Sequence, residues 1–195
     1  MVAVAVLAVA LAIGMPSFAD WISNMRIRST AESLQNGLQF ARSEAVRRNN
    51  PTQFQLVTTA TNSCALSTAG PYWVVNLPTT AASTPAGACG AAVSDATAPY
   101  ILQVSPVVST KALTSVTLAA SQSVISFDGL GRQTASANPA TAALALSIEV
   151  KSSNASSCLQ TGGTGTLRCL RVTVSTSGQI RMCDPYAATG LSTAC

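Results

Sequence analysis

The fold of this chain is decided by residues 25–51, which read MRIRSTAESLQNGLQFARSEAVRRNNP. Apolar residues recur in this stretch at intervals of three and four, the period of a helix with one apolar face. Asn49-Asn50-Pro51 predicts the end of the helix, because proline disfavours helical geometry in the residue before it. We expect Leu34, Leu38 and Ala41 to pack on a sheet. The full apolar stripe comprises Ile27, Ala31, Leu34, Leu38, Ala41 and Ala45.

The residues before this stretch extend the helical prediction to the start of the chain. Residues 1–19 carry no charge, and Asp20 is the first charged residue. Residues 2–13 are apolar on every side, which is typical of a segment in lipid or in a buried bundle. A bilayer crossing needs about 20 apolar residues, so the run is slightly short. One helix over residues 1–49 would reach about 70 Å, and we expect its first half to pack against something outside the domain.

A cleaved signal peptide is the alternative interpretation of this segment. Ser17-Phe18-Ala19 matches the small-x-small pattern of a cleavage site. However, no Lys or Arg precedes the apolar run, so the sequence lacks the basic region that opens a signal peptide. The helical pattern also continues past the cleavage pattern. Both observations favour a retained segment.

From residue 52 onward the helical period disappears, and short β-type runs take over. Gly-, Pro-, Asn- and Ser-rich stretches separate them, notably residues 78–85 and 152–165, which are typical of exposed loops. The order of elements predicts the α+β class, with a long helix packed on an antiparallel β-sheet head. We expect strands at Gln53–Thr58, Tyr72–Leu77, Tyr100–Val104, Ser115–Ala119, Ser123–Phe127, Ala143–Val150, Thr166–Val174 and Gln179–Cys183.

Charge and cysteine content indicate a protein that works outside the cytoplasm. Charged residues make up only 9% of the chain, against roughly 25% in soluble cytosolic proteins. The chain has six cysteines and no histidine, and it has no Cys-x-x-Cys pair, so disulfides are favoured over zinc. The spacing favours local closure, although the count alone leaves other connectivities open. The preferred pairs are Cys64–Cys89, Cys158–Cys169 and Cys183–Cys195.

The amino-acid composition and motifs of the chain do not indicate an enzyme. Without histidine, the usual base for a Ser or Cys nucleophile is missing. No Ser-x-x-Lys motif occurs, and the seven carboxylates are scattered. The stretch Asp128-Gly129-Leu130-Gly131-Arg132 lacks the spacing and the ending of a phosphate-binding loop, so it predicts a turn. We expect no catalytic residue, no cofactor and no metal site.

Residues 1–51 resemble the N-terminal region of type IV pilins, in particular minor pilins of the FimT and FimU type and the related GspH pseudopilins. Three features carry the resemblance in this order: the Val/Ala/Leu run, Gly14-Met15-Pro16-Ser17-Phe18, and Leu38–Asn49 with its Ala-Arg-Ser-Glu-Ala core. An apolar run alone would be weak evidence, but this order is specific. The family opens with a short leader ending in Gly and then Phe-Thr-Leu-Ile-Glu. None of these residues precedes the run, which indicates a truncated or misassigned start at Met1.

The resemblance implies a structural minor pilin of a type IV pilus, acting in assembly, initiation or at the tip. A pseudopilin of the type II secretion system shares the same plan and is the alternative. Residues 1–24 would be the membrane and filament-core helix, and residues 25–195 the periplasmic head, with an amphipathic helix over 25–50 and a β-rich part over 52–195. The implied partners are other pilin or pseudopilin subunits, and the inner membrane before assembly into a periplasmic or extracellular filament. The loop closed by Cys183–Cys195 would be a surface feature.

The resemblance also raises DNA as a partner. Some FimT-type minor pilins bind DNA in natural transformation through a C-terminal Gly-Arg-x-Arg motif. The matching stretch here is Gly178-Gln179-Ile180-Arg181, in which Gln179 replaces the first arginine. Strand alternation and a hairpin turn would bring Arg171 and Arg181 together on an exposed face. With Arg168, they are the candidate phosphate contacts. The alternative is that these arginines only keep a charge-poor surface soluble.

Overall fold

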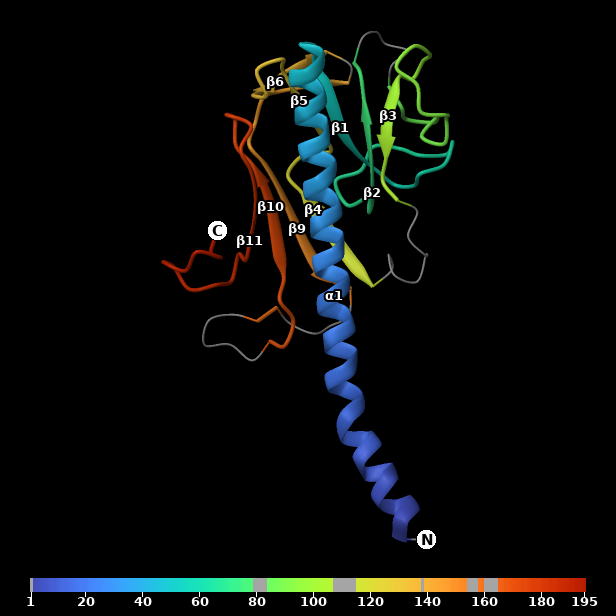
Figure 1. Ribbon diagram of the computed structural model, residues 1–195, viewed down its shortest axis with the longest axis vertical. Helices are drawn as coiled ribbons and strands as arrows, with labels where there is room; N and C mark the ends of the chain where they lie inside the picture. Colours follow the sequence, from blue (N-terminus) through green and yellow to red (C-terminus); the bar gives the residue numbers. More distant parts are fainter. Residues whose placement is uncertain (1, 79–83, 107–114, 138, 154–157, 160–164) are drawn as a thin grey trace.

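The computed structural model describes residues 2–78, 84–106, 115–137, 139–153, 158–159 and 165–195. One long helix, α1 (Val2–Arg48), precedes a head built from strands (Figure 1). The helix extends well beyond the head at its N-terminal end, so the strands cover only its C-terminal part. In the part of the chain described, no helix is both long and apolar enough to qualify as a membrane span.

The end of α1 lies where the sequence predicts it. Asn49 has a φ of 46°, the left-handed conformation that commonly terminates a helix. Its amide donates a hydrogen bond to the carbonyl of Val46, and the amide of Asn50 donates to the carbonyl of Ala45, both at 3.2 Å. These two bonds satisfy carbonyl groups that have no partner within the helix.

The head contains two main antiparallel sheets, where the sequence predicted one. The strand order is β3-β2-β1-β5-β6 in the first sheet and β11-β10-β9-β4 in the second, and β7 and β8 form a separate small hairpin. The α+β class with a long helix on antiparallel strands is confirmed. The strands are β1 (Thr52–Val57), β2 (Tyr72–Asn76), β3 (Ile101–Val104), β4 (Val116–Ala120), β5 (Val124–Phe127), β6 (Gln133–Thr134), β7 (Ser136–Ala137), β8 (Ala140–Thr141), β9 (Leu146–Ser152), β10 (Leu170–Val174) and β11 (Ile180–Cys183).

All eight expected strands are present, and their ends differ by a few residues. The strand expected from Thr166 begins only at Leu170, because the amide of Arg168 donates to a side chain of α1 instead of to a neighbouring strand. Strands β6, β7 and β8 were missed, since two residues are too few to show an alternating pattern. The expected loops over 78–85 and 152–165 lie largely outside the described residues.

The apolar stripe of α1 fills the space between the helix and both sheets. Every member is at most 1% exposed, including the predicted packing residues Leu34, Leu38 and Ala41. The stripe forms one core cluster with Phe54 and Trp73 of the first sheet and with apolar residues of β9 and β10 from the second. Because one helix face closes both sheets, the head and the C-terminal half of α1 form a single folded unit.

Gly37 allows an aromatic pair to lie directly against α1. The rings of Phe54 and Trp73 stack with their centroids 5.6 Å apart. A Cβ at Gly37 would lie 2.8 Å from Trp73 and 2.9 Å from Phe54, closer than side chains tolerate. The indole Nε1 of Trp73 donates a hydrogen bond to Ser33 Oγ at 3.1 Å, which fixes the ring on the helix.

Candidate assembly and binding surfaces

The head is attached to α1 from Asn24 onward. The side-chain Oδ1 of Asn24 accepts a hydrogen bond from the amide of Arg168 at 2.7 Å. Arg26 Nη1 donates to Ser115 Oγ at 3.1 Å, and Ile27 is the first residue of the buried stripe. The preceding part of α1 leaves the head and continues as an isolated helix (Figure 1).

An apolar patch lies on α1 beside this junction. Phe18, Trp21 and Met25 are 62%, 58% and 52% exposed. Their spacing of three and four places them on one side of the helix, and the rings of Phe18 and Trp21 stack at 5.9 Å. Large apolar side chains that are exposed together commonly mark a contact with another protein or with lipid.

The basic hairpin β10–β11 places Arg171 and Arg181 on one face, as the sequence predicted. Arg181 pairs with Thr173, and Arg171 pairs with Cys183, so the two arginines are diagonal neighbours across the strands. Of the two, Arg181 is exposed and Arg171 is half-buried. Arg171 instead donates to Glu149 on β9, the neighbouring strand of the sheet.

Glu149 is also paired with Lys151, at 2.5 Å between Oε2 and Nζ. The hydrogen bonds from Lys151 and then Arg171 lower the pKa of Glu149, because both stabilise the charged carboxylate. Lys151 in turn lies over the ring of Tyr186 in the C-terminal tail, 5.9 Å from its centroid. The charge of Arg171 is therefore already compensated, and it is poorly available to a phosphate.

The glycine of the Gly178-Gln179-Ile180-Arg181 stretch has a packing role. Gly178 has a φ of 83°, and a Cβ there would lie 1.8 Å from the carbonyl oxygen of Gly131. The hairpin turn thus lies directly on the β5–β6 turn. Arg42 Nε donates to the same Gly131 oxygen at 2.9 Å and ties both turns to α1. Only glycine fits this position, whatever the function of the arginine that follows.

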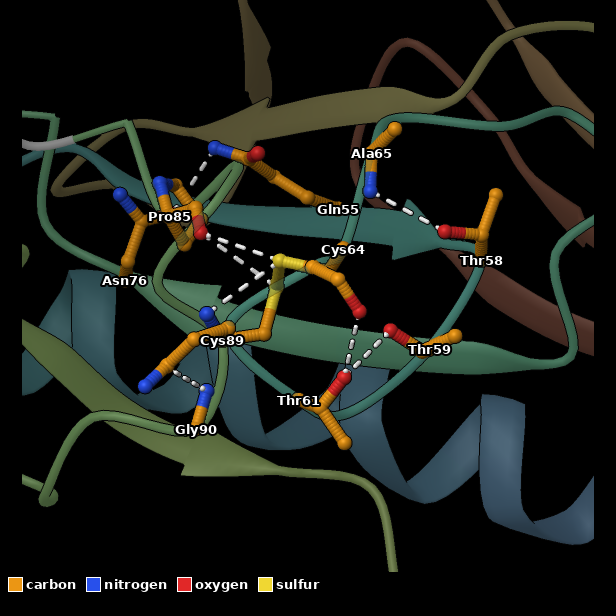
Figure 2. The surroundings of a disulfide bond; sticks show 12 residues. Gln55, Thr58, Thr59, Thr61, Cys64, Ala65, Asn76, Pro85, Cys89 and Gly90 are labelled. Atoms are coloured by element: carbon orange, nitrogen blue, oxygen red, sulfur yellow. Dashed lines mark hydrogen bonds between the residues drawn. A yellow bond between two sulfur atoms is a disulfide. The ribbon is translucent and has the colours of Figure 1, made fainter.

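Three disulfides close local loops, and they join the pairs that the spacing favours: Cys64–Cys89, Cys158–Cys169 and Cys183–Cys195. Figure 2 shows the first of them on the side of the first sheet that faces away from α1. The amide of Cys89 donates to Cys64 Sγ at 3.2 Å, and the amide of Gly87 donates to the carbonyl of Cys64 at 2.8 Å. These contacts hold the β2–β3 loop against the β1–β2 loop, which carries Cys64.

The other two disulfides flank a shallow pocket of about 340 Å³. Leu159, Arg168 and Leu191 lie on its walls and are exposed, and Tyr186 contributes an aromatic side chain. None of the ion pairs among the described residues involves the Arg168 side chain. The sequence analysis missed this pocket, because its residues come from two loops without any periodic pattern.

On the opposite flank of the head, the β2–β3 loop presents Val93 and Asp95, which are 63% and 58% exposed. Asp95 accepts a hydrogen bond from Arg48 at 3.0 Å, and Arg48 also pairs with Glu44 on α1. No sequence signal marks this pair, because residues 48 and 95 meet only through the fold. Throughout the described part of the chain, no group of three or more metal-ligating side chains comes together.

The family model for "Type II transport protein GspH" matches residues 30–178 of the chain. No curated protein matches it. Among solved structures, the chain is similar to the type IV minor pilin FimU of Pseudomonas aeruginosa strain PAO1, with 14% identity and a TM-score of 0.48 over 84% of this chain and 92% of that one. It is also similar to the solution structure of E. coli GspH, with 16% identity and a TM-score of 0.41 over 87% of this chain and 95% of that one.

Proposed function

The chain belongs to the GspH family, and we propose that it is a structural minor pilin of a type IV pilus that acts in assembly, initiation or at the tip. The observation that carries the proposal is the division of α1 at Asn24. The helix after this residue is buried against two sheets, while the helix before it extends alone and exposes Phe18 and Trp21. A helix of this length without cover is expected where neighbouring subunits supply the cover.

The proposal divides the chain into two working parts. Residues 1–24 are the segment held in the inner membrane before assembly and in the filament core afterwards. Residues 25–195 are the periplasmic head. The apolar composition of residues 2–13 supports this division, as does the hydrogen bond that first links head and helix at Asn24. The partners are other pilin or pseudopilin subunits, and no catalytic step is assigned.

A pseudopilin of the type II secretion system is the alternative within the same family. It is favoured by the description of the matching family model as a type II transport protein. Both roles use a helix that neighbouring subunits cover, so the exposed N-terminal part of α1 supports them equally.

DNA binding during natural transformation is a second candidate function, and the geometry supports it less well. Of the three arginines considered, Arg171 is paired with Glu149, while Arg168 and Arg181 are exposed. Arg168 lies at the pocket between the two C-terminal disulfides and not in the hairpin. Arg181 is then the single exposed arginine of the hairpin face, and one phosphate contact gives little affinity.

The test is deletion of the gene in its host, followed by complementation. Surface filaments counted by electron microscopy and secretion of type II substrates are measured together. Loss of filaments with normal secretion is expected. Loss of secretion alone would favour the pseudopilin role, and no change in either would exclude both. Complementation with the Trp21→Ala variant should restore fewer surface filaments than complementation with Leu144→Ala. The Leu144 variant is the control, because it removes a similarly exposed apolar side chain (61%) from the head.

A further inference from the structure

The Ala-Arg-Ser-Glu-Ala core at residues 41–45 of α1 contains one side chain that the packing of the head does not explain. Its two alanines are buried, and Glu44 pairs with both arginines of the last helical turn. Arg42 is exposed, and its Nε donates a hydrogen bond to the carbonyl of Gly131 at 2.9 Å. Within the described part of the chain, its two terminal nitrogens donate no hydrogen bond. The guanidinium is therefore held in place with two N–H-bearing nitrogens still available.

Arg42 lies in a shallow groove of about 360 Å³ on the exposed side of α1. We call it the arginine groove, and it is lined by Gln39, Arg42, Ser43, Val46 and Arg47. Val46 is 50% exposed, and Leu130 of the adjoining β5–β6 turn is 72% exposed. The turn packs on the groove, because a Cβ at Gly131 would lie 3.2 Å from Cγ2 of Val46. Among the described residues, no carboxylate lines the groove, so it combines exposed apolar side chains with positive charge.

The turn that carries Leu130 is held in one conformation. Asp128 Oδ1 accepts hydrogen bonds from the amides of Leu130 and Arg132, both at 2.9 Å, and the amide of Asp128 donates to the carbonyl of Arg132 at 2.8 Å. The side chains of Asp128 and Arg132 also form an ion pair, so these two charges compensate each other. In Figure 1 this turn lies beside the C-terminal end of α1, at the end of the head opposite the N terminus. An exposed leucine held in this way is preorganised for a partner.

Arg42 differs from the other arginines that lack a carboxylate partner. In the described part of the chain, the arginines outside every ion pair are Arg26, Arg42, Arg168 and Arg181. Arg26 is bonded to Ser115, and Arg168 shares its pocket with the carboxylate of Asp184. Arg42 combines an uncompensated charge with an apolar groove that no described carboxylate lines. A guanidinium with free terminal nitrogens favours bidentate pairing with a carboxylate.

The carboxylates of the chain are largely engaged elsewhere, which argues for a different chain as the partner. Five of the seven are in ion pairs with the chain's own cations: Glu32, Glu44, Asp95, Asp128 and Glu149. Of the other two, Asp184 lies in the pocket that contains Arg168, and Asp20 lies on the N-terminal part of α1. A second copy of the chain therefore offers Arg42 few carboxylates.

We propose that the arginine groove binds a different pilin or pseudopilin subunit, which presents a carboxylate to Arg42 and an apolar side chain to Val46 and Leu130. This inference rests on the proposed assembly function. A phosphate of a nucleic acid also pairs with arginine, but it leaves the apolar side chains beside Arg42 exposed. Because the two partners are different chains, the contact does not repeat into an array of identical copies, in agreement with a minor subunit.

The first test uses the full chain in its host with a photoreactive amino acid in place of Leu130, which is exposed enough to be replaced without loss of the fold. Illumination should give a crosslinked heterodimer with another pilin or pseudopilin. Peptide mapping should place the crosslink within a few residues of an Asp or Glu of that subunit. A homodimer alone, a crosslink to nucleic acid or only to proteins outside the pilin families, or the absence of any crosslink would each overturn the proposal.

Charge reversal then tests the pairing of Arg42 with the mapped carboxylate. Arg42→Glu should reduce the heterodimer yield by about fivefold or more, because like charges then face each other. Arg181→Glu, at an exposed arginine outside the groove, is the matched control and should leave the yield unchanged. Replacing the mapped Asp or Glu of the partner by Arg should restore the yield of the Arg42→Glu variant, which a misfolded head would not allow. A yield that Arg42→Glu does not lower, or that the double change does not restore, would contradict the pairing.

The apolar half of the contact has its own test. Val46→Gln should lower the heterodimer yield, because it places an amide where an apolar side chain is expected. Val93→Gln is the control, since Val93 is similarly exposed (63%) and lies outside the arginine groove. Equal yields from the two variants would show that Val46 takes no part in the contact.

Filaments and secretion, measured in the same strains, separate this contact from the proposed function. If deletion of the gene abolishes filaments while the crosslink never forms, the contact is wrong and the proposed function stands. If deletion changes neither filaments nor secretion, the proposed function fails, and the contact fails with it.

Discussion

The amide of Arg168 donates a hydrogen bond to Asn24 Oδ1 at 2.7 Å, although 144 residues separate the two in the sequence. This bond fixes the segment before β10 to the most N-terminal part of α1 that the head contacts. It also explains why β10 starts later than its β-type sequence predicts. The stability of the isolated head should therefore depend on the residue at which α1 is truncated.

Removing residues 1–20 should give a soluble, folded monomer, because the buried stripe of α1 begins only at Ile27. Removing residues 1–24 should also give a folded head, but with a stability lower by about 1 kcal/mol, the typical net value of one hydrogen bond. Size-exclusion chromatography with light scattering measures the oligomeric state of both truncated proteins, and urea unfolding measures their stability. An insoluble head after the shorter truncation would show that the N-terminal segment belongs to the core of the head.

Gly37→Ala should destabilise the head by about 1 kcal/mol, even though alanine favours helix formation. The new methyl group would lie 2.8 Å from Trp73 and 2.9 Å from Phe54, and overpacking of a core commonly costs about 1–3 kcal/mol. Asn36→Ala, on the exposed side of the same helical turn, is the matched control and should be neutral or slightly stabilising. Urea unfolding compares the two. A Gly37→Ala protein as stable as the control would mean that the aromatic pair can move away from the helix.

How far the sequence predicted the fold depends on how local each feature is. The stripe from Ile27 to Ala45 is periodic, so helix, packing face and end at Asn49 follow from the sequence. The disulfide pairs also follow, because each closes a short loop. The division into two sheets did not follow from the sequence. Alternation indicates which face of a strand is buried, but it does not indicate which strand lies beside it.

The binding surfaces were less predictable, because they depend on contacts between residues that are far apart in the sequence. Arg171 and Arg181 were placed on one face by strand alternation, and they lie there. The partner of Arg171 is Glu149, which the sequence did not indicate, because the β9–β10 pairing joins residues on either side of a long loop. The pocket lined by Leu159, Arg168 and Leu191 likewise depends on two loops that meet only in the folded chain.

All six cysteines should be oxidised in the native protein, so a mass-shifting alkylator should find no free thiol. Peptide mapping should recover the three local pairs. Replacing Cys64 and Cys89 together by serine should lower the stability by about 2–4 kcal/mol, because this pair closes the longest loop, with a sequence separation of 25. Mapped bridges that connect different loops would contradict the structure.

Acid stability should depend on Glu149. The carboxylate has a lowered pKa in the folded protein, so it contributes stability above the ordinary Glu pKa, and this contribution is lost as the pH falls through the lowered value. Glu149→Gln should therefore destabilise the protein most at about pH 7, and progressively less as the pH falls below about 4, the ordinary range of Glu. Thermal unfolding across this range measures the difference. An equal loss of stability at every pH would mean that packing, and not charge, explains the effect.

Variants of Arg181 test whether DNA is a partner of the head. If the hairpin face binds DNA, affinity should be weak, independent of sequence and steeply reduced by salt, because release of counterions drives the binding. Arg181→Ala should weaken it without changing the fold, since the side chain is exposed. Gln179→Arg should strengthen it by restoring a second charge beside the turn at Gly178. Arg171→Ala should matter less than Arg181→Ala, because Glu149 already compensates Arg171. Gel-shift titrations of the four proteins at low ionic strength measure these differences. Equal behaviour of all four, or no binding at low salt, would leave these arginines with the role of keeping a charge-poor surface soluble.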